Sequence, residues 1–217
     1  MSESNGDQTT AMRIRVEFAK TEPMRYTSHL DLYRAWERLL RRTGVQMVFS
    51  QGYNPRPKLQ LAAPLALGIT SQVEIIDFWL SEDPGDLNQL ESRLLAAQPP
   101  GIEIRTVEII DPSAPPLQNK VSAAQYQVTL LDQVQDLDQK IDALLASESL
   151  TREKRGKTYD LRPLVQELSV EKSAPDHLQM LLAARDGGTG RPEEVLLALD
   201  IQPENTRIER THLVIQD

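Results

Sequence analysis

Two series of strand and helix patterns, each in the order strand-helix-strand-strand-helix-strand, lie on either side of a proline-rich segment at residues 111–120. In the first half the expected strands are 12–19, 59–63, 72–80 and 102–110, the expected helices are 30–43 and 85–97, and a short further strand at 45–49 would return antiparallel to the first helix. In the second half we expect strands at 124–131, 165–170, 178–184 and 206–215, helices at 134–146 and 191–199, and a hairpin around Gly156. This order is typical of the split βαβ motif. The sequence therefore predicts an α+β fold made of two ferredoxin-like (βαββαβ) halves with antiparallel sheets.

The proline-rich segment also sets the expected domain boundaries. It contains three prolines and no hydrophobic periodicity, which is typical of a linker. We expect a polar, disordered leader at 1–11, an N-terminal domain at 12–110, a linker at 111–120 and a C-terminal domain at 121–217. Because no residue-level repeat relates the halves, a single continuous α+β domain is the competing interpretation.

Cysteine is absent from the chain, which excludes disulfides, thiolate zinc sites, a cysteine nucleophile and a self-ligated iron–sulfur cluster. The three histidines, His29, His177 and His212, are far apart and form no metal-binding pattern, so we expect neither a metal nor a cofactor. No apolar run approaches the roughly 18 residues that a membrane helix needs. The leader lacks the apolar segment of a signal peptide, so a cytoplasmic location is expected.

Basic residues are concentrated near the N-terminus. Residues 12–58 hold ten Lys and Arg against four Asp and Glu, whereas the whole chain has a net charge of −8. One basic segment in an acidic protein indicates an anionic partner.

The start of the first helix contains several polar residues with two possible roles. Ser28 stands where an N-cap residue is expected, and Asp31 follows three residues later as in a capping box. His29 would lie in the first turn, where the helix dipole favours a neutral imidazole that could act as a base or as a hydrogen-bond donor. Simple helix initiation explains Ser28 and Asp31 equally well, and a local hydrogen bond explains His29.

Further along this helix, Arg34, Arg38 and Arg41 recur at i, i+4 and i+7 and form one line, with Arg42 beside it. Such a row repels itself unless an anion lies over it, which favours anion binding. The alternative is a solvated face supported by a pair between Glu37 and Arg41.

The loop that follows, Ser50-Gln-Gly-Tyr-Asn-Pro-Arg-Pro-Lys58, is stiffened by two prolines, and Gly52 and Asn54 tolerate positive φ. Arg56 and Lys58 could hold phosphate, and Tyr53 could stack on an unpaired base. A purely structural Ω-loop is the alternative.

We expect the helix start and this loop to form one cleft. The predicted strand at 45–49 would bring the loop back to the N-terminal end of the helix, where free N–H groups bind anions. The residues expected to converge are Ser28, His29, Asp31, Arg34, Arg56 and Lys58. Glu74 and Asp77 are expected either to orient the arginines or to face solvent.

Several motifs resemble a family of bacterial domains of unknown function that is linked to radical SAM proteins. They are Tyr26-Thr-Ser-His-Leu-Asp-Leu-Tyr-Arg34, Arg41-Arg42, Ser50-Gln-Gly-Tyr-Asn-Pro-Arg-Pro-Lys58, Pro64-Leu-Ala-Leu-Gly68, Ser71-Gln-Val-Glu74, Arg152-Glu153-Lys154 and Arg191-Pro192-Glu193-Glu194. The resemblance implies a radical SAM protein as partner, either separate or fused. The sequence departs from the family pattern at Arg56, where histidine is common. Loop 50–58 therefore keeps a cation at this position but lacks the histidine that could act as a general base.

These observations lead to one main functional hypothesis and two alternatives. The main hypothesis is a non-catalytic RNA-binding and docking module that presents RNA, such as tRNA or rRNA, to the radical SAM partner. The first alternative is a metal-independent RNA endonuclease resembling CRISPR repeat-processing enzymes, in which His29, Tyr26 and Lys58 would be the candidate catalytic residues. The second is a protein-interaction domain whose arginines meet an acidic patch of the partner without RNA.

Overall fold

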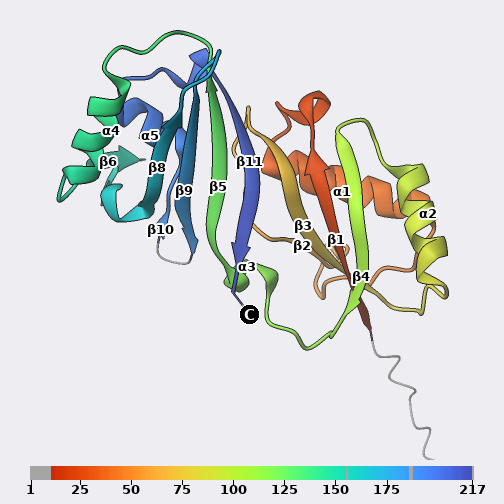
Figure 1. Ribbon diagram of the computed structural model, residues 1–217. Coiled ribbons are helices and arrows are strands. Elements are labelled where there is room, and N and C mark those ends of the chain that lie inside the picture. Colours follow the sequence, from red (N-terminus) through yellow and green to blue (C-terminus); the bar gives the residue numbers. More distant parts are fainter. Residues whose placement is uncertain (1–10, 155, 186–187, 217) are drawn as a thin grey trace, which may run out of the picture.

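The computed structural model describes residues 11–154, 156–185 and 188–216 (Figure 1). All but one residue of the expected disordered leader lies outside this part of the chain. Within it, strands and helices alternate, and two cores lie side by side along one large sheet.

The first half contains β1 (Met12–Lys20), α1 (His29–Thr43), β2 (Leu59–Leu61), β3 (Thr70–Leu80), α2 (Leu87–Ala97) and β4 (Ile102–Ile110). A helical turn, α3 (Leu117–Lys120), ends the expected linker. The second half contains β5 (Val121–Leu130), α4 (Leu137–Ala146), β6 (Thr151–Lys154), β7 (Lys157–Asp160), β8 (Val165–Glu171), β9 (His177–Arg185), β10 (Gly188–Thr189), α5 (Pro192–Ala198) and β11 (Thr206–Ile215). Three short 3-10 helices lie at Glu22–Met24, Arg162–Leu164 and Pro203–Asn205.

Apart from β6 and β7, the described strands of both halves form one nine-stranded sheet of order β10-β9-β5-β11-β3-β1-β4, with β2 beside β3 and β8 beside β9. Almost all described pairings are antiparallel. The pair between β11 and β3 is parallel and joins only Glu209 to Thr70 and Arg210 to Ser71. The fold is therefore mixed α+β. The expected separate antiparallel sheets are replaced by one sheet, because the last strand of the chain reaches back to the edge of β3.

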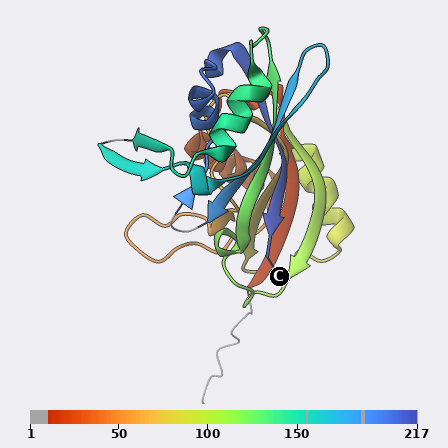
Figure 2. The same ribbon diagram turned by 60° about the vertical axis from the view of Figure 1, so that its left-hand side comes forward.

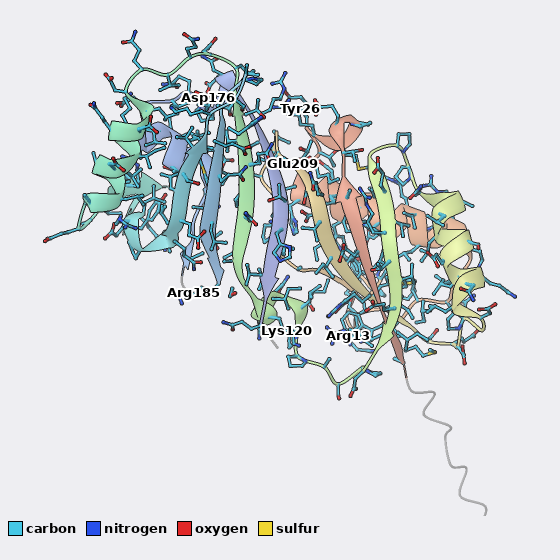
Figure 3. The ribbon with its side chains drawn as sticks, in the orientation of Figure 1. Arg13, Tyr26, Lys120, Asp176, Arg185 and Glu209 are labelled. Atoms are coloured by element: carbon cyan, nitrogen blue, oxygen red, sulfur yellow. The ribbon has the colours of Figure 1, made fainter. Side chains whose placement is uncertain are left out.

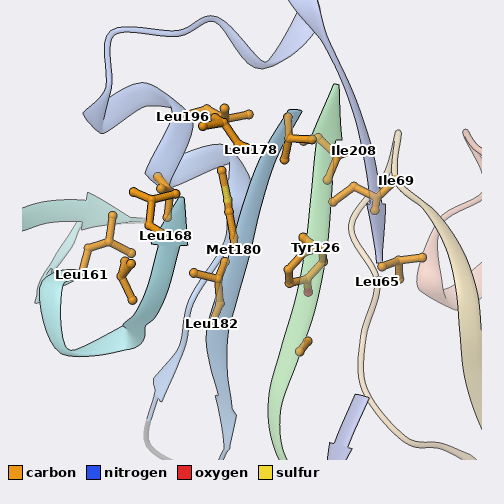
Figure 4. Packing of buried hydrophobic residues seen from close by; sticks show 14 of the residues in the cluster. Leu65, Ile69, Tyr126, Leu161, Leu168, Leu178, Met180, Leu182, Leu196 and Ile208 are labelled. Carbon is orange, nitrogen blue, oxygen red and sulfur yellow. The ribbon is translucent and has the colours of Figure 1, made fainter. Parts of the chain in front are cut away.

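Each half buries its own apolar side chains beneath its helices. In the first half, alternate residues of β1 meet the apolar face of α1, and Trp36 packs edge-on against Phe18 with ring centroids 4.8 Å apart. In the second half, α4 and α5 cover β5, β8 and β9, where Tyr126, Met180 and Leu196 are buried (Figure 4). The β6–β7 hairpin forms its own two-stranded sheet and projects from the body of the molecule (Figure 2).

Three segments cover the edge of β3 that faces away from β1. β11 pairs with its first residues, β2 pairs with Ile76 to Phe78, and residues 46–48 contact its end through Val48 N–H to Trp79 O (2.8 Å). The predicted strand at 45–49 is wrong, since only isolated bridges form there, at Met47 and Phe49. Residues 46–48 contact only the end of β3, beyond the residues that β2 pairs. Covering an edge in this way prevents its free N–H and C=O groups from pairing with another chain.

Candidate nucleic-acid interface

Four of the ten cations of residues 12–58 have structural roles rather than facing solvent freely: Arg13, Arg15, Lys20 and Arg25. Asp77 is completely buried and holds two of them, accepting from Arg13 Nε at 3.0 Å and from Arg15 Nε at 2.8 Å. Arg13 also donates to Ala114 O at 2.6 Å, which attaches the proline-rich segment to β1. The cations available to a ligand are the six that stand exposed on α1 and the following loop: Arg34, Arg38, Arg41, Arg42, Arg56 and Lys58.

Ser28 and Asp31 form the N-terminal cap of α1. Asp31 N–H donates to Ser28 Oγ at 3.2 Å, and the Ser28 hydroxyl donates back to Asp31 Oδ2 at 2.7 Å. Arg34 then donates to Asp31 Oδ1 at 3.1 Å. These contacts hold the pKa of Asp31 below its usual value, first through the Ser28 hydrogen bond and then through Arg34. The structure thus joins three predicted site residues into one surface group, in which Arg34 is partly neutralised.

His29 is partly buried and lies near enough to Glu74 of β3 and Arg210 of β11 for their charges to act on its imidazole. Burial lowers the pKa of its imidazole, the nearby Glu74 opposes that change and Arg210 reinforces it. The neutral form expected from the helix dipole is thus favoured by burial. Among the hydrogen bonds of the described residues, none involves the His29 side chain.

The row of arginines on α1 is exposed over about two turns. Arg38 and Arg41 make no ion pair among the described residues, so the Glu37–Arg41 pair of the solvated-face alternative is not formed. Arg42 donates to Ala97 O at 2.6 Å at the end of α2 and keeps its charge at the surface. An uncompensated row of this kind is suited to phosphate.

The loop 50–58 is held against α1 and presents its polar side chains outward. The Tyr33 hydroxyl donates to Pro57 O at 3.2 Å, and Arg56 N–H donates to Ser50 Oγ at 3.0 Å. Burial raises the pKa of the Tyr33 hydroxyl, Glu37 reinforces this and Arg56 opposes it, which places the Arg56 charge beside the same flank of α1. Tyr53 is 99% exposed, and Asn54 is also exposed.

Lys58 and Tyr26 lie toward opposite ends of β3. Its ammonium stands 4.3 Å from the ring centroid of Trp79, near the end of β3. Tyr26 is next to Arg25, whose Nε donates to Gly68 O at 2.8 Å just before β3 begins. The nine residues between Thr70 and Trp79 span about 30 Å of strand, so the structure does not bring Lys58 to Tyr26. No described contact joins His29 to Arg56, and their sharing one cleft stays a prediction.

The sequence interpretation missed a buried polar cluster at the seam between the halves. Arg210 Nε donates to Glu74 Oε1 at 3.0 Å, and Lys20 Nζ donates to Ile69 O at 2.9 Å. Tyr126 lies beside Arg210, and burial raises the pKa of its hydroxyl. A signal was present, because Lys20 and Arg210 both occupy inward positions of alternating strands, in phase with Phe18 and with Ile208.

In the described part of the chain, no helix is long and apolar enough to cross a membrane. Within the same residues no group of three or more His, Asp or Glu side chains is placed to hold a metal ion.

The chain belongs to a family of uncharacterised proteins conserved in bacteria, DUF2344, whose model matches residues 13–192. None of the curated proteins matches it. Among solved structures it is similar to a chain of a Cbf5-Nop10-Gar1 complex, with 9% identity, 94% of this chain and 50% of that chain covered, and a TM-score of 0.49.

Two further structures are similar to the chain. One is the archaeal box H/ACA sRNP Nop10-Cbf5 complex, with 10% identity, coverage of 94% and 49%, and a TM-score of 0.43. The other is the acetolactate synthase small subunit from Thermotoga maritima, with 13% identity, coverage of 94% and 94%, and a TM-score of 0.28. This chain spans about half the length of the two Cbf5-containing relatives.

Proposed function

We propose that this protein is a non-catalytic RNA-binding and docking module that acts with a radical SAM protein in the cytoplasm, in the modification or processing of tRNA or rRNA. The observation that carries the proposal is the exposed arginine row of α1 beside a loop whose Tyr53 is 99% exposed. Cations on a rigid helix bind the phosphate backbone, and an exposed ring on a tethered loop can stack on an unpaired base. The lack of cysteine assigns any cluster chemistry to the partner chain.

In this proposal each half is a ferredoxin-like unit. The strand order β4-β1-β3-β2 in the first half has the same form as β11-β5-β9-β8 in the second, which supports an architectural duplication. Residues 12–110 and 121–217 would then be two domains that share one sheet. Expression of residues 12–110 alone tests this, and a soluble, cooperatively unfolding fragment is the expected result.

Filter binding to short single-stranded RNA at low salt tests the function. The Arg34→Ala, Arg38→Ala double variant is expected to bind at least about tenfold more weakly, because two phosphate contacts are lost. The matched control is Arg93→Ala with Arg207→Ala, which removes the same charge from exposed positions on α2 and β11. Equal losses in both variants, or no RNA binding by the unaltered protein, would rule the proposal out.

A protein interface without RNA is the second candidate, and exposed apolar side chains near the start of α1 favour it. Tyr26 is 71% exposed, Leu67 59% and Leu30 51%. Tyr26 also lies beside Gly68, which brings it next to Leu67. Affinity purification from the native cell, with and without nuclease, separates the candidates. Recovery of a radical SAM protein that survives nuclease, with no enriched RNA, would favour the protein interface.

The endonuclease alternative finds less support. No described contact joins its three candidate residues, Tyr26, His29 and Lys58. Incubation of the protein with labelled RNA in the presence of EDTA tests it, and intact RNA is the expected result.

A further inference from the structure

A cavity of about 530 Å³ opens between the two halves, on the side of the sheet that carries the helices. Segment 62–66 and Ile69 form one wall, and the end of β9 and the start of α5 form the other. Tyr126 and Arg210 lie at its base, and Figure 4 shows Tyr126 between the strands, with Leu65 and Ile69 across from it. This volume is within the range of small-molecule sites.

The charges around the cavity fall into two groups. Arg210 is already compensated at the base by Glu74, with the backbone oxygens of Ala63 and Pro64 3.4 Å from its guanidinium. Arg185 and Arg191 are exposed at the rim, and no hydrogen bond or ion pair of the described residues involves their side chains. Two uncompensated guanidinium groups at one opening provide a site for a phosphate.

The Glu193 carboxylate sets a second requirement for a ligand of this cavity. Glu193 lines the cavity, and its Oε2 is shielded from solvent and has no hydrogen-bond partner among the described residues. An ionised carboxylate only accepts hydrogen bonds, and a buried acceptor without a donor is costly. Rotation of the Glu193 side chain toward the cavity would let a ligand N–H group donate to this oxygen.

We propose that this cavity binds one nucleotide whose base carries an amino group. The phosphate lies between Arg185 and Arg191, the base rests against the apolar wall of Ala63, Leu65 and Pro192, and the amino group donates to Glu193. Guanine, adenine and cytosine offer such a group. Uracil is disfavoured, because its N3–H is flanked by two carbonyl oxygens that repel the carboxylate.

This inference is independent of the RNA interface proposed for α1, since no cavity residue belongs to α1 or to loop 50–58. In Figure 3, Arg185 at the rim of the cavity lies at the end of β9. The nucleotide comes either from the free pool or from an unpaired position of an RNA chain.

Isothermal titration of the full chain with GMP, AMP, CMP and UMP, and separately with a short single-stranded oligoribonucleotide, tests the proposal. We expect GMP, AMP or CMP to bind more tightly than UMP. Arg191→Ala is expected to weaken binding at least about tenfold, through loss of a charge-assisted contact. Glu193→Gln is expected to reduce the preference for GMP, AMP or CMP over UMP, because the glutamine amide can donate to a uracil oxygen.

Glu194→Gln and Arg207→Ala are the matched controls, since each removes the same kind of charge from a residue that does not line the cavity. Binding of mononucleotides identifies the free pool as the source, and binding of the oligonucleotide alone identifies RNA. The Arg34→Ala, Arg38→Ala variant must leave mononucleotide binding unchanged. The inference is overturned if neither ligand class binds at about 1 mM, if Arg191→Ala binds as well as the control, or if Glu193→Gln retains the full preference.

Discussion

Arg210 of β11 and Glu74 of β3 form a buried ion pair at the seam where the two halves of the sheet join, with Nε and Oε1 3.0 Å apart. Their strands pair there through only two residues each. Both side chains are almost fully buried, so neither charge has water as an alternative partner. The seam therefore depends on this pair more than on its few backbone contacts.

Glu74→Gln is expected to lower the free energy of unfolding by about 3–5 kcal/mol, because it leaves the Arg210 charge buried without its counter-ion. Replacing both residues, as Glu74→Leu with Arg210→Met, is expected to cost less than the single change. Urea unfolding measures both. Glu209→Gln, beside Arg210 on β11 but partly exposed, is the control, and a loss for Glu74→Gln no greater than that of the control would contradict the prediction.

Lys20 gives the seam a pH dependence. Its pKa is lowered from 10.5 to about 8 by burial, an effect that Glu74 opposes. Between these two values the unfolded chain holds a proton that the native protein has released, so stability is expected to rise with pH in this window. The raised pKa of Tyr126 opposes the rise above pH 10. Urea midpoints at pH about 7 and about 9.5 should therefore differ in the unaltered protein.

Lys20→Met removes the titrating group and should abolish most of that difference. Lys157→Met, at an exposed position of the β6–β7 hairpin, should preserve it. If stability to urea rises equally with pH in Lys20→Met and Lys157→Met, the pH dependence belongs to another group.

Position 101 requires glycine for two reasons, which are its backbone conformation and the close approach of Met24. Its φ is +94°, and a Cβ atom there would lie 2.6 Å from Met24 Cγ and 2.8 Å from Met24 N. Gly101→Ala is expected to cost about 2–4 kcal/mol, since left-handed strain and a backbone clash act together. Gly85→Ala, at φ +78° with open space, should cost only about 1–2 kcal/mol. Thermal unfolding measures the loss of stability in each variant and so separates the clash with Met24 from the backbone strain. Equal losses of stability in both variants would show that the Met24 contact is unimportant.

Most elements of the fold follow from local patterns in the sequence. The strand at β1, the cap at Ser28 and the helix that ends at Thr43 are predictable because hydrophobic periodicity and capping are local. The β11–β3 pairing could not be predicted, since it joins residues about 140 positions apart through two residues of each strand. The strand predicted at 45–49 forms only isolated bridges, from Met47 to Leu80 and from Phe49 to Pro57.

The candidate site was predictable where exposure follows from helix geometry. The row Arg34, Arg38 and Arg41 lies on the outer face of α1 as its spacing indicates. Counting charges along the chain could not separate these residues from Arg13 and Lys20, which are buried by partners from distant strands. Net charge locates a basic segment, and only the tertiary contacts identify the cations that a ligand can reach.

The Tyr33 hydroxyl couples loop 50–58 to α1, and Tyr33→Phe removes only its bond to Pro57 O. If the loop and helix bind one RNA, its affinity is expected to fall by about three- to tenfold, since one net hydrogen bond stabilises the loop by about 1 kcal/mol. Stability should change little. Filter binding measures the RNA affinity, and thermal unfolding measures the stability. Unchanged RNA affinity would show that loop 50–58 is not part of the RNA interface.

The salt dependence of RNA binding counts the phosphate contacts directly. For single strands, the slope of log K against log salt falls by about 0.7 for each contact removed. Arg34→Ala with Arg38→Ala is therefore expected to reduce the slope by about 1.4, while Arg93→Ala with Arg207→Ala leaves it unchanged. Affinities at four salt concentrations determine both slopes. Because Arg34 already pairs with Asp31 at 3.1 Å, Arg38→Ala alone should account for more of the change than Arg34→Ala alone. The opposite order would mean that RNA displaces Asp31 and binds at the helix start.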